Sequence, residues 1–151
     1  MTTARVIGLG QRVAGDDGVG LAVVDALRAR GVPAGVEVVC ASEDAALVSL
    51  LETAVPVVLV DAVLGSPAGD VLELDPAELA RRDAHAVSTH GIGVADAVAL
   101  ARTLAPETVA PSVRVVAVTI ERPARYETGL SPAGAAALPH AVARVLALVG
   151  G

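Results

Sequence analysis

Three ionisable residues have types and positions that could form a metal site: Asp17, Asp61 and His90. Two carboxylates and one imidazole form a ligand set that suits a borderline transition metal such as zinc or nickel. Asp17 and Asp61 each follow an apolar run typical of a buried strand, and His90 lies in a loop before a predicted helix. Ligands of open parallel sheets bind beyond the carboxyl ends of the strands, where all three residues could meet. They are far apart in the sequence, so only the fold can bring them together.

Each acidic or histidine residue also has a purely structural explanation, which the sequence alone leaves open. Asp16 is of a type preferred as the N-cap of a helix, here the first one. Asp17 could complement the positive end of that helix. Asp61 could cap or turn the loop after its strand, and His90 could be a solvent-exposed loop histidine.

The segment 4–20 begins like a nucleotide-binding fold, because a short apolar run breaks into glycines as a strand does before a sharp turn. A dinucleotide-binding loop would have a third glycine at position 13, where this chain has Val13. The predicted helix then opens on Asp16 and Asp17, which would repel a phosphate but could hold a cation. A nucleotide-handling enzyme is therefore a weaker alternative for this chain.

Strand-like and helix-like patterns alternate along the chain, which predicts a parallel sheet covered on both faces. The predicted strands are Arg5–Gly10, Val36–Cys40, Pro56–Val63, Asp70–Leu74 and Val113–Ile120. The third is expected at the centre of the sheet, and the fourth as an antiparallel edge strand. The predicted helices are Gly18–Ala29 with Gly31 as its stop, Glu43–Leu51 with Ser42 as its N-cap, Pro76–Arg81, Val94–Leu104 and Ser131–Val149, which Pro139 could divide in two.

Composition bounds the class of protein. With 151 residues, the chain is expected to form one domain over residues 1–151. The longest apolar stretches, Ala54–Val60 and Val113–Ile120, are far too short to span a membrane, and the C-terminal apolar segment carries Pro139 and Arg144. No secretory signal pattern is visible, and the single Cys40 fits a reducing compartment. We therefore expect a cytoplasmic protein with no membrane association.

Charge argues against binding to nucleic acid. The net charge is −6, all 11 basic residues are arginines, and only Arg81–Arg82 are adjacent. Tyr126 is the single aromatic residue, so stacking platforms for bases are absent from the sequence. Nothing in the sequence demands an assembly larger than a monomer.

Six short motifs, in this order, make the chain resemble the endopeptidases that mature nickel–iron hydrogenases by removing a C-terminal extension from the large subunit. They are Gly8-Leu9-Gly10, Gly15-Asp16-Asp17-Gly18-Val19-Gly20, Val60-Asp61-Ala62, Ser88-Thr89-His90-Gly91-Ile92-Gly93, Ile120-Glu121 and Gly129-Leu130-Ser131-Pro132. The resemblance implies a three-layer α/β/α sandwich of the phosphorylase/hydrolase-like type, with a twisted, mostly parallel sheet of five strands. It also implies that Asp17, Asp61 and His90 bind the metal, the same three residues that the sheet argument selected.

The resemblance implies a function as well: a metal-dependent endopeptidase that acts on the nickel-loaded precursor of a hydrogenase large subunit. Nickel would arrive with that precursor, and zinc or cadmium could serve as surrogates. A second hypothesis is a non-catalytic protein that checks nickel or acts as a chaperone for a hydrogenase-like subunit.

The chain departs from the family pattern at two places. Gln11 stands where the family usually has Asn, and Cys40-Ala41-Ser42-Glu43 stands where it usually reads Asp-Gly-Gly-Thr. Either Glu43 or Asp44 supplies the missing carboxylate from a shifted position, or the protein has a different substrate or a weakened peptidase activity. The second departure motivates the non-catalytic hypothesis.

Overall fold

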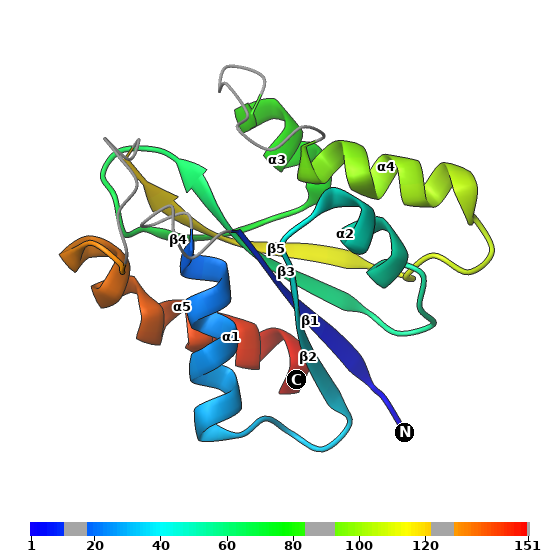
Figure 1. Cartoon of the computed structure of the whole chain (residues 1–151), viewed down its shortest axis with the longest axis horizontal. Helices are drawn as coiled ribbons and strands as arrows, with labels where there is room; N and C mark the ends of the chain where they lie inside the picture. Colours follow the sequence, from blue (N-terminus) through cyan, green and yellow to red (C-terminus); the bar gives the residue numbers. More distant parts are fainter. Residues whose placement is uncertain (11–17, 84–92, 122–128, 151) are drawn as a thin grey trace.

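The chain folds into three layers, with helices on both faces of a five-stranded sheet (Figure 1). The computed structural model describes residues 1–10, 18–83, 93–121 and 129–150. The strands are β1 Ala4–Leu9, β2 Val36–Ala41, β3 Val57–Leu64, β4 Val71–Leu74 and β5 Val113–Ile120. The helices are α1 Val19–Arg30, α2 Asp44–Leu50, α3 Pro76–Asp83, α4 Val94–Leu104 and α5 Pro132–Gly150. This arrangement confirms the predicted fold class.

The strands lie in the order β2-β1-β3-β5-β4, and all neighbours are parallel except β4 and β5. The predictions of a central third strand and an antiparallel edge strand are therefore correct. β3 and β5 are almost entirely aliphatic because both of their faces are covered by helices. Their register pairs Val57 with Val113 at one end and Leu64 with Ile120 at the other.

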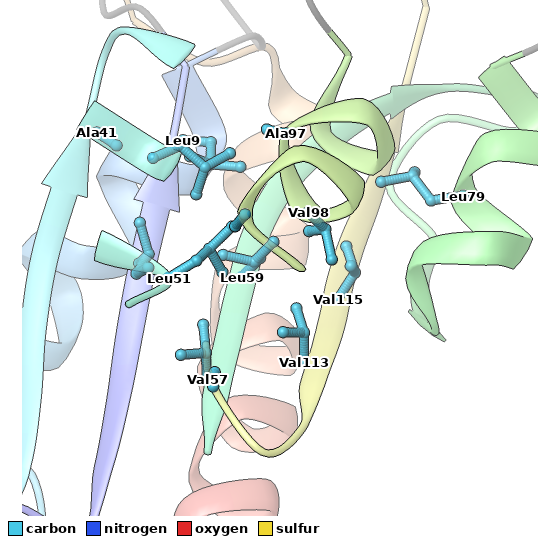
Figure 2. Packing of buried hydrophobic residues seen from close by; sticks show 14 of the residues in the cluster. Leu9, Ala41, Leu51, Val57, Leu59, Leu79, Ala97, Val98, Val113 and Val115 are labelled. Atoms are coloured by element: carbon cyan, nitrogen blue, oxygen red, sulfur yellow. The ribbon is translucent and has the colours of Figure 1, made fainter. Parts of the chain in front are cut away.

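Alternating side chains divide the core into two clusters, one on each face of the sheet. Ile7 and Leu59 point into the cluster under α2, α3 and α4, which Figure 2 shows from close by. Val6 and Val58 point into the other cluster, under α1 and α5. Each strand thus stabilises both helical layers at once.

The N-caps of two helices differ from the predictions. The N-cap residue of α1 is Gly18, so the interpretation of Asp16 as its N-cap is wrong. The N-cap of α2 is Glu43 rather than Ser42, in extended conformation and without a side-chain cap hydrogen bond. The stop at Gly31 is confirmed, with a φ of 86° that favours glycine.

The closing helix α5 is continuous through Pro139, although the sequence allowed two pieces. Pro139 and Ala135 are both exposed, so water can hydrogen-bond the carbonyl that loses its helical partner. By length and composition alone, α5 could cross a membrane, with a hydropathy of 1.5. In this fold its buried residues, among them Ala141 and Val145, pack against the sheet and α1.

Candidate active site

Asp61 lies inside β3, at the point where β3 extends beyond its pairing with β1. The register between β1 and β3 ends at Gly8 and Val60, whereas β3 continues beside β5, pairing Asp61 with Ala117. Asp61 is therefore the first residue of β3 past the paired part of β1. The explanation of Asp61 as a cap or turn residue is wrong, because the strand continues to Leu64.

The Asp61 carboxylate is half-buried and held by the backbone. Its Oδ1 accepts a hydrogen bond from the Ala62 N–H at 2.8 Å. By alternation, Asp61 falls on the same face of β3 as the buried Leu59 and Val63, which is the face covered by α2, α3 and α4. Partial burial of a hydrogen-bonded carboxylate suits a metal ligand that must keep one orientation.

The first turn of α1 is packed directly onto this point through two glycines. A Cβ atom on Gly20 would lie 2.4 Å from the carbonyl oxygens of both Leu9 and Val60. A Cβ atom on Gly8 would lie 2.5 Å from the Gly20 carbonyl oxygen. Only glycines permit so close an approach of helix to sheet. Gly20 thus sets the start of α1 against the residue that precedes Asp61.

The start of α4 lies near the same edge. Gly93 caps this helix, and its carbonyl oxygen accepts a hydrogen bond from the Ala97 N–H at 2.9 Å. Ala97 is fully buried in one cluster with Leu9, the last residue of β1, and Figure 2 shows the two at the same end of that cluster. His90 precedes Gly93 by three residues in the sequence.

Two of the three predicted ligands, Asp17 and His90, lie outside the described residues, in the segments 11–17 and 84–92. Asp61 is the member of the set that the structure describes. Within the described part of the chain, no three His, Cys, Asp or Glu residues gather closely enough to hold a metal ion. The structure therefore brings to one edge the elements that flank the predicted ligands, and it leaves their convergence as a prediction.

The altered segment Cys40-Ala41-Ser42-Glu43 lies at this edge as well. Ala41 ends β2 and pairs with Leu9 at the end of β1. Cys40, Ser42 and Glu43 are exposed. β1 lies between β2 and β3, so the end of β2 is two strand spacings, roughly 10 Å, from β3.

Sequence reasoning missed one residue that shapes this edge: Thr119, the sole buried polar side chain in the described ranges. Its hydroxyl donates to the Pro67 carbonyl oxygen at 2.8 Å and accepts from the Asp70 N–H at 2.8 Å. The Thr119 backbone oxygen also accepts from the Gly69 N–H at 2.7 Å. Thr119 therefore ties the loop between β3 and β4 to β5. No sequence motif marks it; a lone threonine in an aliphatic strand is the only signal.

Comparisons with known proteins agree with the fold. A family model described as hydrogenase maturation protease matches residues 21–148, a range that includes Asp61 and His90 and begins after Asp17. The hydrogenase maturating endopeptidase HybD from E. coli has a similar structure, with a TM-score of 0.82 and 23% identity, over 99% of this chain and 93% of that one. The [NiFe] hydrogenase maturation protease HybD from Thermococcus kodakarensis is also similar, with a TM-score of 0.74 and 20% identity, over 98% of this chain and 99% of that one. Comparison with curated protein sequences gave no match.

Proposed function

Because this chain belongs to the hydrogenase maturation protease family, and is therefore a proteolytic enzyme, we propose that it trims a hydrogenase large-subunit precursor. The cut would remove a C-terminal extension, and the nickel already inserted in the precursor would be held by Asp17, Asp61 and His90. Nickel is thus part of the substrate in this proposal. Zinc or cadmium would substitute for it.

One observation carries the proposal: the contact of Gly20 with the Val60 carbonyl oxygen. It sets the helix that follows Asp17 against the residue that precedes Asp61. The burial of Ala97 in the same cluster as Leu9 adds the helix that follows His90. The donor set, two carboxylates and an imidazole, fits nickel or zinc in chemical type.

The residues have separate tasks in the proposed reaction. A metal ion at this edge would polarise the scissile carbonyl and lower the pKa of bound water. The Ala62 N–H would hold the Asp61 carboxylate in one orientation. The reaction would need no nucleophilic side chain. Cys40 is exposed at the end of β2, and β1 separates that strand from the strand of Asp61, which argues against a thiol mechanism.

The decisive experiment is incubation of the protein with nickel-loaded large-subunit precursor, followed by intact-mass spectrometry. We expect one shortened subunit and one released peptide per precursor, and no cleavage of precursor that lacks nickel. The double variant Asp17→Ala, His90→Ala should abolish cleavage. A matched double variant, Asp70→Ala, His140→Ala, removes an exposed carboxylate and an exposed imidazole outside the predicted ligand set and should cleave normally. Cleavage by the first double variant would eliminate the proposed site.

The altered segment Cys40-Ala41-Ser42-Glu43 favours one competing function, a nickel-checking or chaperone-like protein that binds the subunit without cutting it. Tight binding of the nickel-loaded precursor with no released peptide would support this alternative.

In either case we propose that the protein acts in the cytoplasm as a monomer. Size-exclusion chromatography with light scattering and cell fractionation test those two points.

A further inference from the structure

A shallow groove between α2 and α4 has no role in the reaction described above. It has a volume of about 230 Å³, and its lining includes Val48, Ala101, Leu104, Val109 and Glu52. We propose that this groove is a docking site for the large-subunit precursor, which inserts an apolar side chain beside a basic one. The proposal rests on the proposed function, since that function supplies the protein partner.

The groove is open to solvent, and polar and apolar surface contribute about equally to its lining. Leu104 forms one of its walls and is 69% exposed, so a partner that covers it would bury apolar surface. Leu100, four residues earlier on the same flank of α4, is 38% exposed. An aliphatic cavity of about 150 Å³ already holds a benzene ring, so this groove can take a large apolar side chain. Such a side chain would remove Leu104 from water.

One charged group, the Glu52 carboxylate, lines the groove, and it favours a partner with a basic side chain. The Glu52 carboxylate is exposed, and its Oε1 accepts a hydrogen bond from the Thr108 hydroxyl at 2.9 Å. Among the residues that the structure describes, no arginine lies within ion-pairing distance of Glu52. Arg102, the basic residue in the last turn of α4, does not line the groove. A lysine or arginine next to the inserted apolar residue would complete an ion pair with Glu52.

The groove and the candidate active site are close enough for one folded partner to cover both. α4 has 11 residues, so about 16 Å separates its two ends. The groove lies at the end of α4 where Leu104 stands, and the candidate active site lies near the end where Gly93 stands. Both are on the sheet face that Asp61 shares. A standard protein interface covers about 800 Å² on each partner, which is enough to span that distance.

The test is a binding titration of purified nickel-loaded precursor against four proteins: wild type, Leu104→Glu, Glu52→Gln and Ala147→Glu. Leu104→Glu should raise the Kd at least tenfold, and Glu52→Gln should raise it threefold or more and weaken its dependence on salt. Ala147→Glu places the same carboxylate on an exposed position of α5, in the opposite layer, and should leave the Kd unchanged. At saturating precursor, kcat of both groove variants should equal that of wild type.

The outcomes separate the groove from the proposed function. Kd values of Leu104→Glu and Glu52→Gln within twofold of wild type would overturn the docking site, while cleavage by wild type would leave the peptidase assignment standing. Binding that the groove variants weaken, without any cleavage by wild type, would keep the docking site and overturn the peptidase assignment. Absence of both binding and cleavage would overturn both. A wild-type dimer that Leu104→Glu dissociates would show that a second copy of the chain occupies the groove, against our proposal.

Discussion

Gly20 and Val60 are in backbone contact: a single added methyl group at Gly20 would stand 2.4 Å from the Val60 carbonyl oxygen. The same methyl group would meet the Leu9 carbonyl oxygen at 2.4 Å from the other side. Both obstacles are backbone atoms of buried strands, which cannot rotate away as a side chain can. The position of α1 relative to β3 is therefore set by the absence of a side chain.

Gly20→Ala should push α1 away from the sheet and cost about 1–3 kcal/mol of stability, as overpacking of a tight core does. We also expect it to slow cleavage of the precursor by roughly a hundredfold, since a shift of about 1 Å in a reacting group has effects of that size. Urea unfolding and initial cleavage rates measure the two effects.

The control for Gly20→Ala is Gly150→Ala, whose Cβ would meet only Pro33 at 4.0 Å. It should change neither stability nor rate. Gly20→Ala with wild-type stability and rate would show that the contact does not position α1.

Asp61→Asn should leave the fold intact and reduce cleavage more than about 100-fold, because it would remove the charge of a proposed metal ligand, and groups that only orient such a ligand already contribute about 10–100-fold. The amide oxygen can still accept from the Ala62 N–H, so the substitution removes the negative charge while keeping the local hydrogen bond. Intact-mass spectrometry of the precursor measures the rate, and circular dichroism checks the fold. The matched control is Asp70→Asn, because Asp70 carries an exposed carboxylate in the loop before β4. Equal rates for the two variants would remove Asp61 from the site.

Thr119→Val should cost about 1–3 kcal/mol, because the Asp70 N–H and the Pro67 carbonyl oxygen lose their shared hydroxyl partner. Thr119→Ser keeps the hydroxyl and loses one methyl group, so a smaller cost of about 1 kcal/mol is expected. Urea unfolding of the two variants distinguishes the hydrogen bonds from packing. A serine variant as unstable as the valine variant would assign the effect to the methyl group instead.

The Asp75 carboxylate predicts an acid-dependent loss of stability. Its Oδ1 accepts from the Glu78 N–H at 2.8 Å, and this backbone hydrogen bond is the main reason that the pKa of Asp75 lies below its ordinary value of 3.8. The Asp75 N–H donates to the Glu78 carboxylate at 3.3 Å, which completes a capping box at the start of α3. Because the folded-state pKa is depressed, the stabilisation is fully present above pH 3.8 and is lost as pH falls through the lowered pKa.

Thermal unfolding of wild type and Asp75→Asn between pH 7 and pH 2.5 tests this point. The two melting temperatures should differ by a constant amount at neutral pH and converge in the acid range. A difference that stays constant down to pH 2.5 would show that the charge of Asp75 contributes nothing.

Local patterns predicted the elements well and their ends less well. The bounds of α4, Val94–Leu104, and of β5, Val113–Ile120, match the predictions, because an apolar stripe or an aliphatic run reports directly on burial. The N-caps at Ser42 and Asp16 were wrong by one and two residues. The N-cap position depends on where the chain leaves the sheet and enters the helix. The preference of certain side chains for the N-cap is too weak to move that position.

The sequence by itself determined the α/β class, the central place of β3 and the position of Asp61 within that strand. Aliphatic runs, helical spacing and glycines are local properties, and each can be interpreted without knowledge of its neighbours in space. Only the tertiary structure decided that β3 extends past β1 at Asp61, that Gly20 rests on Val60, and that Leu104 and Glu52 share a groove. These relations join residues that lie tens of positions apart. They follow from how two helical layers pack on one twisted sheet, which no single segment specifies.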